Sequence, residues 1–268
     1  MSPETTRLAV LIDADNTSAK HVSALLDELA AYGVTTVKRA YGDWTTPQLG
    51  GWKPELSNHA IEPIQQFSYT TGKNATDSAL IIDAMDLLYS DNLDAFALVS
   101  SDSDFTGLAI RLRRSGKTVY GLGLRKTPQS LVAACDKFIY LEVLGEGEEE
   151  GSSDEAPALP DLRRLLTRAV NSRAGDDHWA HLGSVGQYLN SASANFDSRN
   201  YGYPKLISLV QDQDFLDVEH EDGKPARVRL RSQRPAKKAS KKAAAKGAAK
   251  ATKKATKSAA KDGARSRQ

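Results

Sequence analysis

The sequence predicts an α/β domain with a parallel sheet, followed by a small winged-helix domain and a basic tail. In the first half of the chain, short apolar or β-branched runs alternate with segments of helical spacing. A polar, acidic stretch follows at residues 145–159, and residues 232–268 consist mostly of Lys and Ala. These changes in composition divide the chain into residues 1–144, 145–159, 160–231 and 232–268.

Residues 1–144 carry the strand and helix signals of an α/β domain. Between the strand-like runs, apolar residues recur with helical spacing, as in Leu25 and Leu29 or in Leu80, Ala84 and Leu88. Because strands and helices alternate, we expect a parallel sheet covered by helices on both faces. The predicted strands are Leu8–Ile12, Val34–Tyr41, Ile61–Tyr69, Ala95–Ser100, Thr118–Leu122 and Phe138–Leu141.

The two segments that follow differ sharply from each other. Residues 145–159 are too polar and too charged to bury a core, which predicts a flexible linker. Residues 160–231 contain three helical patterns, at Leu162–Ala169, Leu182–Leu189 and Tyr203–Val210. Two strand-like runs, Phe215–Glu219 and Ala226–Leu230, then flank a turn signal. Three helices before a hairpin predict a winged helix.

Charge is distributed unevenly along the chain, although the 268 residues carry a net charge of only +2. Residues 232–268 hold 13 Lys and Arg and one Asp, which gives +12. The remaining residues hold 23 basic and 33 acidic side chains, which gives −10. Repulsion among the tail's cations predicts disorder until a polyanion binds. We therefore expect the tail to bind nucleic acid without sequence preference.

Cysteine content and hydropathy narrow the class of protein. The single cysteine, Cys135, argues against a disulfide framework and against a Cys-rich zinc site. The apolar stretch Leu8–Ile12 is too short for a signal peptide, and nothing later approaches the length of a membrane span. The sequence therefore favours a cytoplasmic protein without a membrane partner.

Acidic residues follow the predicted strands. Asp13 and Asp15 end the first strand, and Asp102 and Asp104 follow the run Ala95–Ser100. Asp77 falls in the first turn of a predicted helix, with Thr76 as its N-cap. In an open parallel sheet, functional groups gather beyond the carboxyl ends of the strands. We therefore expect these carboxylates to lie together.

Clustered carboxylates repel one another unless a cation is shared among them. With no Cys or His nearby in the sequence, the oxygen ligands suit Mg²⁺ or Mn²⁺, which commonly bind substrate phosphate. Phosphodiester hydrolysis is the chemistry that this predicts. The alternative is that each Asp only caps a helix, which is the commoner role of a lone Asp at a strand end.

Three motifs in the first domain, in this order, resemble the NYN domain family. They are Leu11–Asn16, Lys73–Ala84 and Ser100–Phe105. The resemblance implies a PIN-like fold and a metal-dependent ribonuclease. It also implies that the metal ligands are Asp13, Asp77, Asp102 and Asp104, with Asn16 positioning water or phosphate.

Other residues of these motifs have lesser expected roles. Lys73 is a candidate contact to RNA phosphate, whereas Lys117 is expected only to be solvated. Asp15 ranks below the four ligands, and Asp83 lies about 240° around the helix from Asp77, so it is expected to point elsewhere. Ser101 stands where the family commonly has Gly, which predicts a different turn.

The second domain resembles the OST-HTH (LOTUS) family, through the string Phe196–Leu206 above all. Such domains are associated with RNA binding and often follow a NYN domain. Arg199 and Lys205 are predicted to contact phosphate, and Tyr201 and Tyr203 to stack on bases. The alternative is that the tyrosines pack the start of the third helix.

Two other functions remain open from the sequence. The run Asp13–Thr17 also satisfies the D-x-D-x-T signature of haloacid dehalogenase-type phosphatases, in which Asp13 would be the nucleophile. That mechanism gives Asp77 no role. A catalytically silent RNA-binding scaffold is the non-enzymatic alternative.

Overall fold

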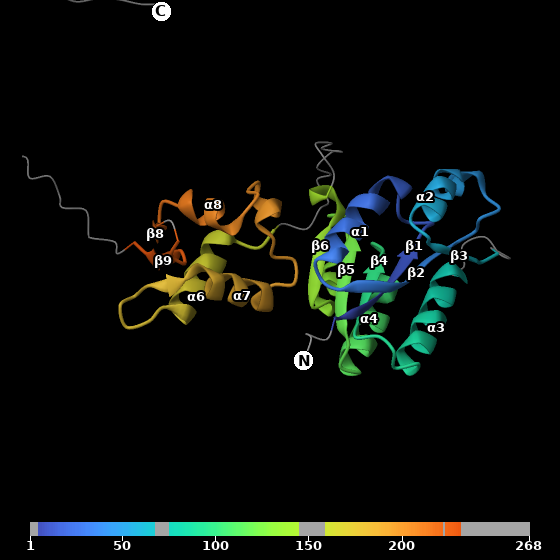
Figure 1. The fold of residues 1–268 in the computed structure, drawn as a ribbon, viewed down its shortest axis with the longest axis horizontal. Coiled ribbons are helices and arrows are strands. Elements are labelled where there is room, and N and C mark those ends of the chain that lie inside the picture. The colour runs from blue at the N-terminus through green and yellow to red at the C-terminus, as the bar shows by residue number, and fades with distance from the viewer. Residues whose placement is uncertain (1–4, 68–74, 145–158, 222, 232–268) are drawn as a thin grey trace, which may run out of the picture. The chain divides into compact units, whose positions relative to one another are not determined.

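The computed structural model describes residues 5–67, 75–144, 159–221 and 223–231. In the first domain, six parallel strands form one sheet in the order β3-β2-β1-β4-β5-β6 (Figure 1). This confirms the predicted α/β class. The strands are β1 (Arg7–Asp13), β2 (Val34–Gly42), β3 (Glu62–Gln65), β4 (Ala95–Val99), β5 (Thr118–Gly123) and β6 (Lys137–Tyr140).

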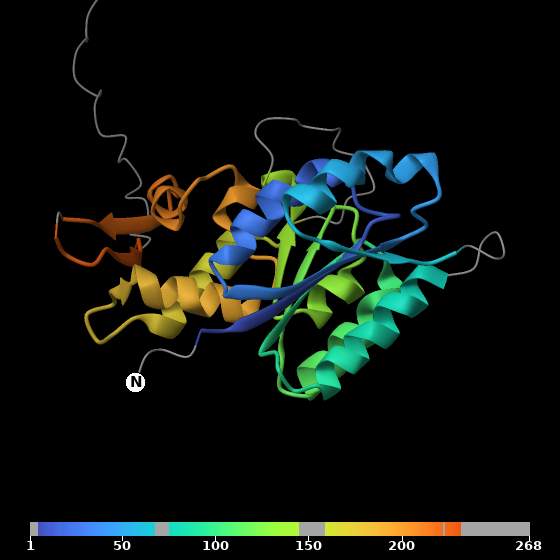
Figure 2. The same cartoon turned by 45° about the vertical axis from the view of Figure 1, so that its right-hand side comes forward.

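Helices cover both faces of this sheet (Figure 2). Helices α1 and α2 pack on one face, and α3, α4 and α5 pack on the other. The α-helices are α1 (Val22–Ala30), α2 (Trp52–Asn58), α3 (Ala75–Tyr89), α4 (Thr106–Arg114) and α5 (Gln129–Ala134). The 3-10 helices are η1 (Ala19–His21), η2 (Pro47–Gly51), η3 (Ser103–Phe105) and η4 (Leu141–Val143).

The central strand β1 supplies side chains to both hydrophobic layers. Leu8, Val10 and Ile12 belong to the cluster that contains α1, whereas Ala9 and Leu11 belong to the cluster that contains α3. Successive side chains of a strand point to opposite faces, so a strand covered on both sides has to be apolar throughout. The continuous apolar run that predicted this strand therefore reflects burial on both faces.

The second domain has its own hydrophobic core. Three helices pack with a three-stranded sheet in the order β7-β9-β8, with antiparallel pairs, and β7 lies between the first two helices in the chain. Its elements are α6 (Leu162–Arg173), β7 (Ala180–His181), α7 (Leu182–Ala192), η5 (Ser198–Tyr201), α8 (Leu206–Gln211), β8 (Leu216–Glu219) and β9 (Arg227–Leu230).

Several predicted boundaries differ from the structure by a few residues. The third helix of this domain begins at Leu206 rather than Tyr203, because Gly202 adopts a left-handed conformation with φ of 84° and Pro204 follows it. The predicted strand Ile61–Tyr69 is described as a strand only over Glu62–Gln65.

Most of the predicted linker and the whole basic tail lie outside the described residues. Among the described helices, none is long and apolar enough to cross a membrane.

Gly123 at the end of β5 provides a test of the packing between β5 and the end of β4. A Cβ atom there would lie 2.6 Å from the backbone oxygen of Ser100, whereas one on Gly107 in α4 would meet nothing within 4 Å. We expect Gly123→Ala to lower the stability of the fold by about 1–3 kcal/mol. Gly107→Ala should raise it by about 1 kcal/mol through helix propensity. Urea denaturation measures both changes, and equal effects of the two substitutions would contradict this packing.

Candidate metal centre

The acidic site lies where the connections of the sheet reverse direction. From β1 the chain runs outward through β2 to β3, then returns to β4, which pairs with β1 on its other side. The carboxyl ends of β1 and β4 therefore lie side by side, with Ile12 opposite Val99. Asp13 is the last residue of β1, and Ser100–Asp104 follow β4 directly. A switch point of this kind is the usual position of a ligand site in open α/β sheets.

Asp13 is the most deeply buried of the acidic residues, with none of its surface exposed. One carboxylate oxygen, Oδ2, accepts hydrogen bonds from Ser100 Oγ at 2.8 Å and from Asn16 Nδ2 at 2.9 Å. The backbone N–H of Asn16 donates to the other oxygen, Oδ1, at 3.3 Å. Burial raises the pKa of Asp13, although these hydrogen bonds act in the opposite direction.

Ser100 links the end of β1 to the loop after β4. Its hydroxyl donates to Asp13 and also accepts a hydrogen bond from the backbone N–H of Asp102 at 3.1 Å. Ser100 was expected at a strand end and at the start of the motif Ser100–Phe105, without a role of its own, so this connection was missed. The available signal in the sequence was its position, at the end of a predicted strand and two residues before Asp102.

Asp102 caps η3, which is the role that the capping alternative gives to an Asp at a strand end. Its Oδ1 accepts a hydrogen bond from the backbone N–H of Asp104 at 2.9 Å. Capping occupies one oxygen and is compatible with ligation through the other. Ser101 is not among the described non-glycine residues with positive φ, and its Oγ accepts from the backbone N–H of Leu124 at 2.9 Å. A serine is therefore accommodated at the position where the family commonly has Gly.

Asp77 lies in the first turn of α3 and is 8% exposed. Burial, together with the charges of Asp13, Asp102, Asp104 and Asp15, raises its pKa to about 6. Each of these charges disfavours ionisation of Asp77. The side chain is therefore held in an environment that a cation would make more favourable.

Three of the four predicted ligands meet closely enough to share one ion. Carboxylate oxygens of Asp77, Asp102 and Asp104 all lie within 4.8 Å of one another. Asp13 is not part of that closest group, but it is near enough to raise the pKa of Asp77. The donor set consists of carboxylate oxygens, which suits a hard divalent cation such as Mg²⁺ or Mn²⁺. The residues present therefore fit the metal that the sequence predicts.

The remaining acidic residues of the motifs have other partners. Asp15 accepts a hydrogen bond from Thr76 Oγ1 at 2.8 Å, and Thr76 lies inside α3 rather than at its N-cap, because the helix begins at Ala75. Asp83 pairs with Arg39 at 2.6 Å and accepts a hydrogen bond from the Tyr41 hydroxyl. Asp83 thus points away from the site, as the helical spacing predicted.

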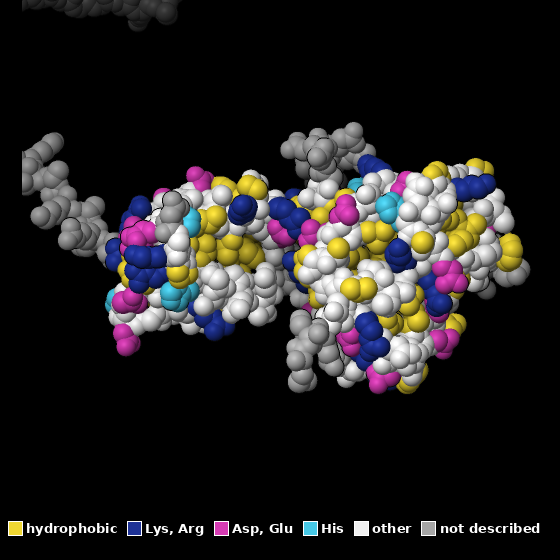
Figure 3. Space-filling view, in the orientation of Figure 1, with side chains coloured by type: hydrophobic (Ala, Val, Ile, Leu, Met, Phe, Trp, Pro, Cys, Tyr) yellow, Lys and Arg dark blue, Asp and Glu magenta, His cyan; other side chains and the backbone are white. Residues whose placement is uncertain are grey.

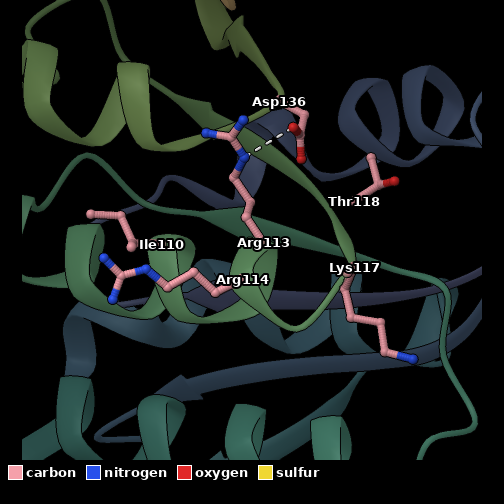
Figure 4. A pocket seen from close by; sticks show the side chains of 7 residues that line it. Ile110, Arg113, Arg114, Lys117, Thr118 and Asp136 are labelled. Carbon is pink, nitrogen blue, oxygen red and sulfur yellow. Dashed lines mark hydrogen bonds and ion pairs between the residues drawn. The ribbon is translucent and has the colours of Figure 1, made fainter.

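Of the two lysines weighed as phosphate contacts, only Lys117 lies among the described residues. Lys73 lies outside the described residues. Lys117 pairs with Asp91 at 2.7 Å and lines a hollow of about 490 Å³ beside the start of β5, away from the carboxyl ends of the strands (Figure 4). In the same hollow, Arg113 pairs with Asp136 at 2.9 Å. Carboxylates therefore offset much of the positive charge of the hollow.

The residues predicted to bind RNA in the second domain are largely engaged by protein groups. Arg199 pairs with Asp197 at 2.7 Å and with Glu28 at 2.9 Å. The Tyr201 hydroxyl donates to the backbone oxygen of Pro160 at 2.9 Å, and the Tyr203 hydroxyl donates to Asp212. Both tyrosines also pack against the domain core. Lys205 is exposed just before α8. RNA binding by these four residues stays a prediction.

The fold and the acidic switch-point site define a nuclease-like α/β domain. A family model described as the NYN domain matches residues 7–142, and one described as the OST-HTH/LOTUS domain matches residues 158–228. The chain therefore belongs to the NYN domain family and carries an OST-HTH/LOTUS domain after it. Both resemblances drawn from the sequence are confirmed.

No curated protein matches this chain, whereas several solved structures are similar to it. A protein of unknown function from Vibrio parahaemolyticus is 19% identical, covers 58% of this chain and 98% of its own, and gives a TM-score of 0.45. A fragment from Chromobacterium violaceum is 35% identical over 27% of this chain and 82% of its own, with a TM-score of 0.24. An uncharacterized protein from Nitrosomonas europaea is 29% identical over 32% of this chain and 90% of its own, with a TM-score of 0.25.

The raised pKa of Asp77 leads to a prediction about stability without metal. Ionised Asp77 lowers the stability of the folded state, and this loss is complete above pH 6. It disappears below pH 3.8, the ordinary pKa of an Asp side chain, because Asp77 is then protonated in both states. We expect Asp77→Asn to raise the Tm at pH 8 by a few degrees, roughly the effect of 1 kcal/mol in a protein of this size. At pH 4.5 the gain should be smaller.

The measurement is thermal unfolding in the presence of a chelator at both pH values. Asp86→Asn is the matched control, because Asp86 is an exposed carboxylate on the same helix. It should change the Tm little at either pH. An Asp77→Asn gain that is as large at pH 4.5 as at pH 8 would rule out carboxylate repulsion as the cause.

Proposed function

We propose that this protein is a metal-dependent ribonuclease that hydrolyses RNA phosphodiester bonds at the acidic site of its NYN domain. The observation that carries the proposal is the convergence of Asp77, Asp102 and Asp104, with Asp13 beside them, at the switch point of the sheet. Both matched domains are associated with RNA, which supports RNA as the substrate class. The haloacid dehalogenase alternative is set aside, because the NYN match includes Asp13–Thr17 and that mechanism leaves Asp77 unused.

Asp13, Asp77, Asp102 and Asp104 would hold Mg²⁺ or Mn²⁺. Such an ion, when bound, activates water and offsets the charge that develops on the scissile phosphate. Ser100 and Asn16 keep the Asp13 carboxylate oriented through hydrogen bonds that their side chains donate to its Oδ2. Asp77, whose pKa is about 6, has to lose its proton before it can act as a metal ligand. Metal binding is therefore coupled to proton release.

Substitution of the proposed ligands tests the activity directly. We expect wild-type protein to cleave single-stranded or structured RNA with Mn²⁺ or Mg²⁺ and to lose activity in a chelator. Asp13→Asn and Asp77→Asn should each reduce the cleavage rate by about 100-fold or more, because metal ions supply several kcal/mol of charge stabilisation. Gel analysis of end-labelled RNA measures the rates.

Asp86→Asn, which removes an exposed carboxylate from α3, is the matched control and should cleave like the wild type. Equal cleavage by the wild type and by Asp13→Asn would show that the assignment of Asp13 is wrong. If wild-type protein binds RNA but cuts none of these substrates, the scaffold function replaces the nuclease. Turnover of an aryl phosphate instead of RNA would restore the phosphatase alternative.

The basic tail leads to a separate prediction about affinity. Residues 232–268 hold 13 Lys and Arg, which can displace counterions from a nucleic-acid backbone. Deleting them should weaken RNA binding and flatten the dependence of affinity on salt, while cleavage of saturating RNA persists. Fluorescence anisotropy at several KCl concentrations measures this. A truncated protein with the same salt dependence as the full chain would exclude this role for the tail.

A further inference from the structure

The OST-HTH domain has an uneven distribution of unpaired positive charge. Residues 159–231 contain ten Lys and Arg and ten Asp and Glu, so the domain is neutral overall. Six of the ten cations form ion pairs with carboxylates: Arg163, Arg199, Lys224, Arg227, Arg229 and Arg231. Over β8 and β9, basic and acidic side chains lie next to one another at the surface (Figure 3). These pairs leave little net field at that end of the domain.

The other four cations have no ion pair with any described carboxylate, and three of them lie on α6. They are Arg164, Arg168, Arg173 and Lys205. Leu166, Ala169 and Val170 bury the opposite side of α6 in the domain core, so Arg164 and Arg168 project into solvent. The two arginines are four residues apart, which places them on the same side of the helix about 6 Å apart along its axis.

A shallow hollow of about 730 Å³ lies along this side of α6. Besides the two arginines, its lining includes Arg163, Thr167, Asn171 and Ser172. Arg163 is held by Asp214 at 3.6 Å and stacks over the Phe215 ring at 4.4 Å. Asp161, which also lines the hollow, uses Oδ1 to cap α6 by accepting from the backbone N–H of Arg164 at 3.1 Å. The hollow thus combines guanidinium groups with neutral hydrogen-bonding side chains.

This combination matches the backbone of a nucleic acid. Guanidinium groups bind phosphate through two parallel hydrogen bonds, and Thr, Asn and Ser side chains contact phosphate and sugar oxygens. The lining contains no aromatic side chain, so it offers no platform for stacking bases. The hollow therefore fits the phosphodiester backbone and carries no means of reading sequence.

We propose that the face of α6 formed by Arg164, Thr167, Arg168 and Asn171 binds the phosphate backbone of single-stranded RNA. This proposal rests on the proposed function for its substrate class, but it assigns the contact to residues other than Arg199 and Tyr201, which are bonded to protein groups. Substrate RNA is held by α6 in a sequence-independent manner while the acidic site of the NYN domain acts on it.

The test uses the full chain with Arg164→Gln and Arg168→Gln together, in a chelator that prevents cleavage. Anisotropy of a labelled single-stranded RNA is measured at several KCl concentrations. We expect the Kd to rise by about 10-fold at moderate salt and the slope of log affinity against log salt to fall by about 1.4, since each phosphate contact on a single strand contributes about 0.7. A DNA strand of the same sequence should lose affinity equally if only the backbone is contacted.

Arg229→Gln with Arg231→Gln is the matched control, because it removes the same charge from the same domain but from residues paired with Asp217. It should change the Kd by less than about 2-fold, and thermal unfolding should confirm that both variants are folded. Unchanged binding by the α6 variant, or an equal loss in the control, would overturn the proposal. RNA cleavage by the same preparations in Mn²⁺ separates the two ideas: an inactive wild type whose binding still depends on α6 defeats only the nuclease.

Discussion

Mutual repulsion among carboxylates at the ends of β1 and β4 is the constraint around which the first domain is organised. The strand order places these ends side by side, and α3 adds Asp77 from a separate part of the chain. The pKa of Asp77 rises to about 6 because burial and the nearby carboxylates both oppose its ionisation. A fold that gathers such groups loses stability, so their proximity indicates a function that needs them together.

The site withstands this repulsion because the surrounding groups are fixed by hydrogen bonds. Ser100 donates to Asp13 and accepts from the backbone of Asp102, so a single hydroxyl couples the two strand ends. Asp83 is removed from the cluster by its ion pair with Arg39 and its hydrogen bond from Tyr41. The carboxylates that remain at the switch point are those that a divalent cation could share.

In the OST-HTH domain, most charged side chains are paired with opposite charges instead of being clustered with like charges. Most of its arginines and lysines are neutralised by local carboxylates, which leaves α6 as the helix with the largest share of unpaired cations among the described residues. The net charge of the domain therefore does not show which part of its surface attracts a polyanion. In the function proposed here, the acidic site would carry out the chemistry and the α6 face would hold the RNA backbone.

The sequence by itself determined the α/β class, the order of the two domains and the identity of the acidic motifs. Apolar runs such as Leu8–Ile12 report burial on both faces, and this local signal does not depend on the rest of the fold. The short strand β7 was missed, because it forms only through its pairing with β9. The start of α8 was misplaced, because the left-handed Gly202 determines it.

Only the tertiary structure decided which side chains meet. Ser100 and Asp13 are 87 positions apart in the chain, and their hydrogen bond follows from the parallel pairing of β1 with β4. Likewise, Arg199 and Arg164 look equivalent as sequence letters, yet one lies between two carboxylates and the other has none as an ion-pair partner among the described residues. Ion pairing depends on distances in space, which residue types and spacing along the chain do not contain.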